Sequence, residues 1–288
     1  MSSYARGLLI AIIGILILTP DSATLNMVDA DPFAVLFWRS CGLMLTMFSV
    51  AFIVHRKNLI RYFRALGWIG VASVPLLALT QICFVVGVQL TNPSHVLVML
   101  AAVPLSGAIF SRLILAERID LATLISIFAG MFGVTVMVLG SFGGGNLAGD
   151  IMAAGVPIFF GLWMVLNRLS KAGDTFLPHG ISAIVTGVFC FYVADSLVIP
   201  GEDYLPMAAN ALIIATVPFM CIIIALRHVS AAEVGLVALL ETLIGPLWVW
   251  LAIGVAPTFW AGVGGGIFLV TLLFYGGYKI MLEQKKHR

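Results

Sequence analysis

The sequence of 288 residues is poor in charge: Asp, Glu, Lys and Arg make up 10% of it, and 61% is hydrophobic. A soluble domain carries about a quarter charged residues. With a mean hydropathy of +1.13, the composition therefore excludes a soluble domain and indicates an integral membrane protein. The apolar runs are continuous and do not alternate with polar residues, which excludes a transmembrane β-barrel and predicts helices.

Motifs for metals, nucleotides and disulfides are also missing. The four cysteines, Cys41, Cys83, Cys190 and Cys221, lie inside apolar runs without a CxxC pair, so we expect buried free thiols. There is no HExxH motif and no Gly-Lys phosphate loop. The sequence therefore predicts no cofactor, no metal and no enzyme, and it argues against an ATP-driven pump within this chain.

Ten apolar segments each fit the ~20 residues that cross the hydrocarbon core of a bilayer. They cover residues 6–27, 33–54, 65–89, 93–113, 121–140, 150–168, 177–199, 206–226, 230–254 and 257–279. The first is read as a retained span and not as a signal peptide, because Pro20 and Asp21 follow it without a small-x-small cleavage site. The fold class is all-α integral membrane with ten transmembrane helices.

The charges predict the orientation of these spans. With the N-terminus inside and the spans alternating, 14 of the 15 Lys and Arg residues fall on the inner side, and Arg39 lies within a span. The outer joints hold Asp29, Asp31, Glu202 and Asp203. This asymmetry predicts N-in and C-in. The net charge of +2 reflects the same rule, so we expect a lipid bilayer and no nucleic acid as partner.

The chain divides into two units of five spans. The predicted parts are residues 1–140, a Gly-rich connection at 141–149, residues 150–282, and a basic cytoplasmic tail at 283–288. Five spans per unit require the second unit to be inverted in the membrane, so we expect two inverted repeats around a central cavity. A run of small residues at Gly264–Gly266 predicts close helix packing or a weak homodimer as the alternative to a monomer.

Six prolines lie within spans 1, 3, 4, 6, 8 and 9, which are corresponding spans of the two units. They are Pro20, Pro75, Pro104, Pro157, Pro218 and Pro246. A proline inside a helix removes one hydrogen bond and kinks the axis. A single one is often only tolerated in a membrane helix, but the matched set predicts a cavity lined by six bent helices.

Three short motifs occur in order along these spans: Phe37-Trp38-Arg39, the segment from Pro104 to Arg118, and LETLIGPLW from Leu240 to Trp248. With ten spans, they make the chain similar to the EamA-type branch of the drug/metabolite transporter superfamily. The overall pattern looks most like its aromatic amino-acid exporters. The resemblance implies export of small metabolites by alternating access. A Gly-Glu pair that many members carry after spans 4 and 9 reads Ala116-Glu117 and Gly254-Val255 here.

Asp21 and Arg39 should lie at the same depth in the outer half, because helical rise places one ~22 Å above the inner end of span 1 and the other ~9 Å below the outer end of span 2. We predict an ion pair between them. It acts either as a packing contact or as an outer gate that contacts a substrate carboxylate.

Span 9 carries two acids at different depths. Glu241 lies near its middle, where an ionised side chain is costly, so it suits proton coupling or recognition of an amino group. The alternative is a protonated side chain that bonds a neighbouring helix. Glu233 lies near the inner face, where solvation or an inner-rim role is expected.

Further candidates for substrate contact lie on the proline-bearing spans. Trp163 lies below the belt where tryptophan anchors at the interface, so it could stack on an aromatic or cationic substrate or simply fill packing space. His95 could titrate near neutral pH or have a structural role. The remaining candidates are Gln81, Met99, Asn167 and Thr216.

Together these features predict a secondary transporter that exports amino acids, aromatic or neutral, or related small metabolites. The expected location is the bacterial cytoplasmic (inner) membrane, with a small-molecule substrate and proton coupling left open. The alternative is a proton-coupled exporter of aromatic or quaternary-ammonium cations of the multidrug type.

Overall fold

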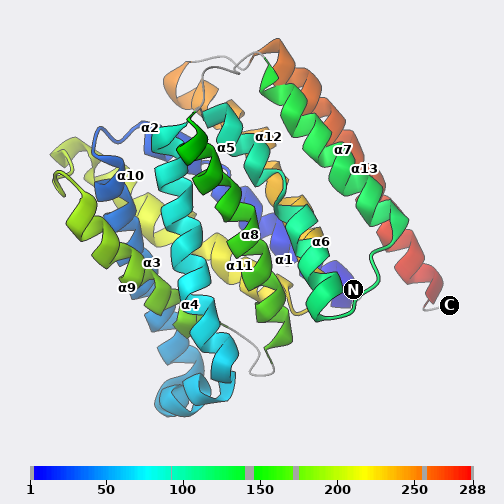
Figure 1. The fold of residues 1–288 in the computed structure, drawn as a ribbon, viewed down its shortest axis with the longest axis horizontal. Helices are drawn as coiled ribbons and strands as arrows, with labels where there is room; N and C mark the ends of the chain where they lie inside the picture. Colours follow the sequence, from blue (N-terminus) through cyan, green and yellow to red (C-terminus); the bar gives the residue numbers. More distant parts are fainter. Residues whose placement is uncertain (1–2, 92, 140–145, 171–174, 255–257, 287–288) are drawn as a thin grey trace.

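A computed structural model describes residues 3–91, 93–139, 146–170, 175–254 and 258–286, and this part of the chain is helical (Figure 1). The α-helices are α1 (Ser3–Leu18), α2 (Asp21–Asn26), α3 (Pro32–His55), α4 (Leu59–Leu90), α5 (Pro93–Leu100), α6 (Val103–Ile114), α7 (Leu121–Met137), α8 (Leu147–Leu169), α9 (Phe176–Val193), α10 (Tyr204–Ala209), α11 (Val217–Ala225), α12 (Ala231–Ile253) and α13 (Phe259–Lys286). Two 3-10 turns, η1 (Arg56–Asn58) and η3 (Gly201–Asp203), and a π-helical segment, η4 (Asn210–Ile214), complete them.

Eight helical stretches among the described residues are long and apolar enough to cross a membrane. The positions of expected spans 1 and 5 hold two shorter apolar helices, α1 and α7. The chain is thus a multi-pass helical membrane protein, and the count of ten spans stays a prediction. α1 falls short because the helix breaks after Leu18 and resumes as α2 at Asp21.

The six prolines behave in two ways. Pro20, Pro104 and Pro218 coincide with breaks: the first lies between α1 and α2, and the other two stand in the first turn of α6 and α11. At these positions a missing N–H costs nothing, because the first helical turn has no internal acceptor for it. The remaining three lie inside helices that continue past the proline: α8, α12 and the part of α4 that follows its kink at Gly67.

Several helix ends differ from the sequence boundaries. α9 ends at Val193, short of the expected residue 199. α8 begins at Leu147, inside the expected connection, with Asn146 as a side-chain cap, whereas residues 140–145 lie outside the described part. α13 continues to Lys286, so the first part of the expected tail is helical. Capping and local hydrogen bonds determine where these helices end. The sequence boundaries were based on hydropathy, which contains no information on capping.

The packing partners have an internal symmetry. α3 packs against α9, α6 against α12 and α7 against α13, so helices of corresponding expected spans meet. α4 packs against α8 as α11 packs against α1, and α6 packs against α8 as α12 packs against α1. These principal pairs of partners are therefore unchanged when the two halves are exchanged. This is the pattern that a pair of structural repeats produces.

Small residues permit the closest of these contacts. A Cβ on Gly264 would lie 2.3 Å from the carbonyl oxygen of Gly133, so α13 can approach α7 only because glycine stands there. A Cβ on Gly235 would lie 2.8 Å from Cα of Pro104, which fixes the approach of α12 to α6 in the same way. The small-residue run of span 10 thus packs within the chain.

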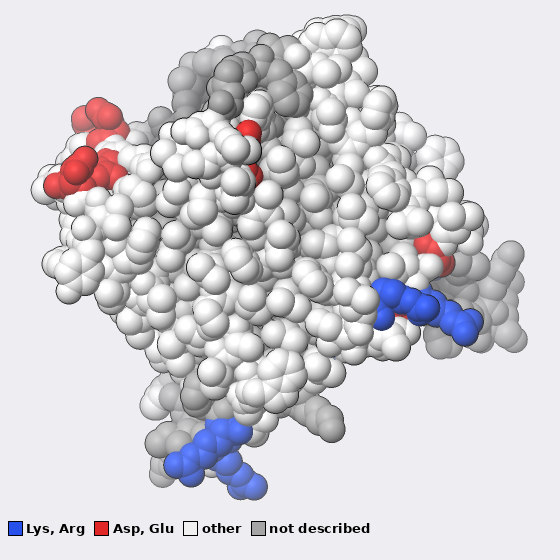
Figure 2. Space-filling view, in the orientation of Figure 1, with Lys and Arg blue, Asp and Glu red and all other residues white. Residues whose placement is uncertain are grey.

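Charges lie at opposite ends of the visible face. In Figure 2 most visible Asp and Glu side chains gather at the upper left, Lys and Arg lie along the lower and right edges, and a broad uncharged surface separates them. Figure 1 places the labelled N- and C-termini near each other at the lower right. An uncharged band of this kind suits contact with lipid.

Candidate functional site

The break between α1 and α2 creates a polar centre within the helices. α2 starts at Asp21, and α3 presents Arg39 to it: Arg39 Nη1 lies 3.2 Å from Asp21 Oδ2. The side chains are 18% and 10% exposed, so the pair is mostly withdrawn from the surface. The expected ion pair is present, and a role as a gate remains a prediction.

Asn210, at the start of the π-helical segment η4, joins this centre from the second half of the chain. Its Nδ2 donates to Asp21 Oδ1 at 2.8 Å and to Thr24 Oγ1 at 2.7 Å. Its Oδ1 is buried and has no hydrogen-bond partner among the described residues. Both carboxylate oxygens of Asp21 are therefore occupied, whereas one strong acceptor beside them is free.

Glu241 on α12 lies near this centre, because α12 packs against α2, the helix that begins at Asp21. Among the described residues its carboxyl group has no hydrogen bond and no ion pair. The outer part of α12 is held by Trp248, whose Nε1 donates to Thr19 Oγ1 at 2.9 Å. A carboxyl group without a partner beside a charged pair is available to a proton or a substrate.

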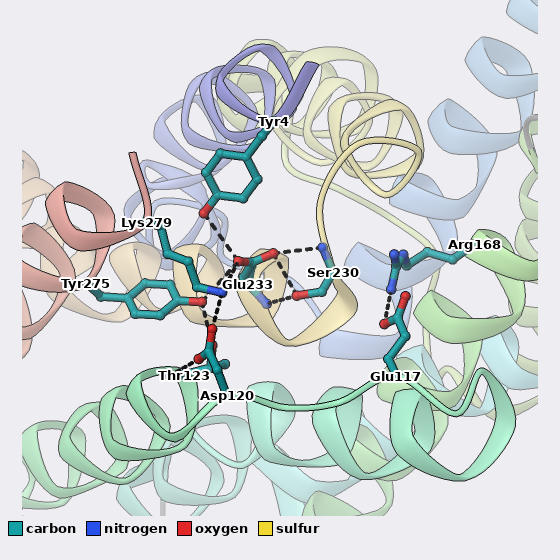
Figure 3. Close-up of polar contacts among 9 residues, drawn as sticks. All are labelled: Tyr4, Glu117, Asp120, Thr123, Arg168, Ser230, Glu233, Tyr275 and Lys279. Atoms are coloured by element: carbon teal, nitrogen blue, oxygen red, sulfur yellow. Dashed lines mark hydrogen bonds and ion pairs between the residues drawn. The ribbon is translucent and has the colours of Figure 1, made fainter. Parts of the chain in front are cut away.

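A second polar network surrounds Glu233 at the start of α12 (Figure 3). The hydroxyl groups of Tyr4 and Tyr275 donate to its Oε1 at 3.2 and 3.0 Å. Its Oε2 accepts from the backbone N–H and the hydroxyl of Ser230 at 2.9 and 2.8 Å, which completes a capping box. Lys279 Nζ lies 3.5 Å from Oε1. Glu233 is only 6% exposed, so the solvation expected as one alternative is wrong, whereas the inner-rim role stays a prediction.

The network continues to α7. Lys279 Nζ also lies 2.6 Å from Asp120 Oδ2, and the Thr123 hydroxyl and backbone N–H donate to Asp120 Oδ1. Partial burial opposes ionisation of Asp120, but the hydrogen bonds from Lys279 and Thr123 outweigh it and lower its pKa. Figure 3 shows these side chains converging from α1, α7, α12 and α13. The ends of four helices are thereby tied together.

A separate ion pair links the two halves beside this network. Arg168 Nη1, near the end of α8, pairs with Glu117 Oε2, which follows α6 (Figure 3). Glu117 is the glutamate of the Ala116-Glu117 pair noted in the sequence. Because Glu117 pairs with an arginine of the other half, it connects the end of α6 to the end of α8.

The third feature is a cluster of rings between α8, α9 and α11. Trp163 stacks on Phe160 with centroids 5.4 Å apart, and both rings contact others: Trp163 meets His179 at 5.8 Å and Phe160 meets Phe219 at 6.2 Å. His179 and Phe219 close the cycle at 4.6 Å. Trp163 and His179 are fully buried, and their ring nitrogens have no partner among the described residues. In this conformation Trp163 packs with protein rings.

The other predicted substrate residues are spread over the structure. Among them, Gln81 resembles Trp163 in having a buried nitrogen, Nε2, without a partner in the described part of the chain. His95 Nδ1 lies 3.0 Å from Asp150 Oδ1, which also accepts from the Thr91 hydroxyl at 2.7 Å. These bonds tie α4 and α5 to the start of α8. Met99 lies at the end of α5, where its carbonyl accepts from the N–H of residue 102.

Asn167 and Thr216 are used in local structure. Asn167 Oδ1 accepts from the Thr175 hydroxyl at 2.7 Å, which holds the end of α8 near the start of α9. The Thr216 hydroxyl donates to the carbonyl of Ala211 at 2.8 Å, so it stabilises the break between η4 and α11. Neither contact excludes substrate binding in another conformation, and both assignments remain predictions.

Hollows in the described residues lie on the flanks of the helices. One of about 160 Å³ between α12 and α13 is lined by Pro246 and Gly265, among others. Another of about 590 Å³ lies between α3 and residues 197–212, with Trp38 and Tyr204 in its lining. The expected central cavity stays a prediction. No group of three His, Cys, Asp or Glu side chains that could hold a metal occurs among the described residues.

Sequence reasoning missed two residues that the structure emphasises, Asn210 and His179, and it missed the hydrogen bonds of Glu233. The capping bonds of Glu233 could have been found from Ser230-Ala-Ala-Glu233, which is a capping-box pattern. Asn210 and His179 are polar side chains inside expected spans 8 and 7, and such residues are a functional signal by default. Their partners lie far away in sequence, so only the fold brings them together.

The comparisons with known proteins agree with this architecture. Residues 5–139 match the model of the EamA-like transporter family. The match covers somewhat less than half of the chain, and it makes residues 5–139 similar to a family of membrane transporters. No curated protein matches the sequence.

One solved structure, "Crystal structure of protein", is similar in fold. It superposes with a TM-score of 0.80 over 93% of this chain and 96% of its own chain, at 16% sequence identity. At this identity the likeness shows the fold alone. The arrangement of the described helices, including those beyond residue 139, is therefore that of a fold seen in a solved structure.

Proposed function

We propose that the chain is a secondary transporter that exports amino acids, aromatic or neutral, or related small metabolites across the bacterial cytoplasmic membrane by alternating access. The observation that carries this proposal is the polar centre of Asp21, Arg39 and Glu241. It combines a mostly buried ion pair with a carboxyl group that has no partner in the described part of the chain. Charged groups inside membrane helices are costly and mark substrate or ion pathways.

The symmetric packing supports the mechanism. Two halves with corresponding packing partners can rotate against each other. This motion would expose a site between them to one side of the membrane and then to the other. The proposed repeats are residues 1–140 and 150–282, with both termini inside. The network around Glu233 joins α1 of one half to α12 and α13 of the other, so we assign it to closure of the inner side. The working unit is a monomer or a weak homodimer.

A second candidate is a proton-coupled exporter of aromatic or quaternary-ammonium cations. The observation that favours it is the unpaired carboxyl of Glu241 together with the ring cluster around Trp163. A carboxylate attracts a cation, and aromatic faces bind one through their quadrupoles. In this case Arg39 would have no substrate group to bind.

Flux measured in reconstituted proteoliposomes tests the proposal. Labelled phenylalanine and threonine, and a labelled quaternary-ammonium cation, are each followed with and without a pH gradient. We expect saturable flux of an amino acid. Saturable flux of the cation alone would favour the second candidate, and the absence of saturable flux for every solute would overturn both.

A further inference from the structure

The polar centre around Asp21 holds one acceptor that the protein itself does not use. Asn210 is fully buried, and its Oδ1 has no partner among the described residues, although its Nδ2 makes two short hydrogen bonds. A buried carbonyl oxygen without a hydrogen bond destabilises the fold. A buried acceptor without a partner requires an explanation. A substrate that donates a hydrogen bond to Asn210 Oδ1 during transport provides one.

The orientation of the Asn210 amide follows from its neighbours. Asp21 is bonded to Arg39 through Oδ2, so its Oδ1 is an acceptor and must face the amide nitrogen. The reversed amide would place two oxygens against each other. The free position of the amide is therefore an acceptor, which suits an N–H or O–H donor.

Arg39 provides the complementary function. A guanidinium group has five N–H donors, and in the described part of the chain Asp21 is the hydrogen-bond partner of Arg39. With 18% of its side chain exposed, the remaining donors can be reached from outside the pair. Arginine binds carboxylates through two parallel hydrogen bonds, so these donors suit a carboxylate.

Glu241 lies on α12, which packs against α2, the helix that begins at Asp21, and its carboxyl group lacks a partner in the described residues. The centre thus combines free donors on a cation with two free acceptors, one neutral and one acidic. An α-amino acid carries the matching pair of groups, a carboxylate and an ammonium, on adjacent atoms. A quaternary-ammonium cation has no N–H to donate and no carboxylate.

Resting on the proposed transport function, we infer that this centre binds the zwitterionic end of the transported amino acid. Arg39 binds the carboxylate, and Asn210 Oδ1 together with Glu241 accepts the ammonium. Asp21 positions the site, because it holds both Arg39 and Asn210. Asn210 is therefore a specificity-determining residue, contributed by the π-helical segment η4 of the second half. π-Helical segments often occur at functional sites.

Three ligands with the same ring and chain test this inference: phenylalanine, phenethylamine without the carboxylate, and 3-phenylpropionate without the ammonium. Each competes against labelled phenylalanine in proteoliposomes. For the wild-type chain we expect both analogues to bind roughly tenfold or more weakly than phenylalanine, because each loses one charge-assisted contact.

Asn210→Leu keeps the volume and removes the acceptor. We expect it to weaken phenylalanine and phenethylamine roughly tenfold and to leave 3-phenylpropionate unchanged. Asn210→Gln is the matched variant, since its amide retains both an acceptor and the donors that Asp21 and Thr24 need. It should bind both ammonium-bearing ligands more tightly than Asn210→Leu does. It also provides the test if Asn210→Leu does not fold.

A parallel loss for all three ligands would show that Asn210 only supports the structure, and no change for any ligand would show that it does not bind substrate. Either result overturns the inference while wild-type phenylalanine flux leaves the proposed function intact. If the wild-type chain carries quaternary-ammonium cations and no amino acid, the proposed function and the inference both fail.

Discussion

The hydroxyl of Tyr4 donates a hydrogen bond to Glu233 Oε1 at 3.2 Å, although the residues are 229 positions apart. The contact joins the first turn of α1 to the first turn of α12, and therefore one half of the chain to the other. Glu233 is also held by Lys279 of α13. A single carboxylate thus links three helices, α1, α12 and α13, at the end of the molecule that we propose closes the inner side.

Glu233→Gln should destabilise this closure. The amide can still cap Ser230, but it loses the attraction of Lys279 and cannot accept the tyrosine bonds as strongly. We expect a loss of about 1–3 kcal/mol in the free energy of unfolding, measured by thermal denaturation in detergent. The control is Glu202→Gln on the exposed 3-10 turn η3, which should change little. Equal effects of the two substitutions would contradict a special role for Glu233.

The charges of Asp21 and Arg39 should be interchangeable as a pair but not singly. Each single reversal leaves like charges together in a mostly buried site and should cost roughly 3 kcal/mol and most export activity. The double reversal should recover stability relative to both. A double variant that is no more stable than either single variant would disprove mutual pairing.

The pair of Glu117 and Arg168 is the matched comparison. Its side chains are 34% and 20% exposed, so water screens it more strongly than the pair in the outer centre. Glu117→Gln should cost less than about 1 kcal/mol in the same denaturation assay. A cost as large as that of reversing Asp21 would contradict the ranking by burial.

Asp120 gives a pH-dependent prediction. Its pKa is lowered in the folded chain, because hydrogen bonds from Lys279 and Thr123 outweigh the effect of burial. A lowered folded pKa contributes stability that is fully present above the unfolded pKa, near 3.8, and is lost as the pH falls through the folded value. Asp120→Asn should therefore lower the melting temperature slightly at pH 7. The difference from wild type should shrink below about pH 4.

The membrane class, the placement of most spans and the pair of Asp21 and Arg39 could be predicted from the sequence, because hydropathy and helical rise act locally. The breaks were predictable only in part. Proline breaks a helix where it can occupy a first turn, as at Pro104, but α8 continues through Pro157, and this choice depends on neighbouring helices. Hydropathy also carries no record of capping, so it overran the end of α9.

The polar network around Glu233 could not be predicted from the sequence for a different reason. Glu233 lies near a span end, where water is the default partner, and its burial depends on Tyr4 and Tyr275 from distant spans. The same holds for Asn210, which contacts Asp21 across 189 positions. Long-range partners of polar residues require the tertiary fold, even where the helices are evident.

The most direct test of the central claim is phenylalanine flux through the wild-type chain and Glu241→Gln in proteoliposomes, each with and without a pH gradient. The glutamine amide matches the glutamate carboxyl group in size, but it does not take up or release a proton and carries no charge. The account predicts saturable flux through the wild-type chain and a roughly tenfold or greater loss in the variant. If protons are coupled, stimulation by the gradient should also disappear in the variant. Absence of saturable wild-type flux, or a variant with unchanged flux, would contradict it.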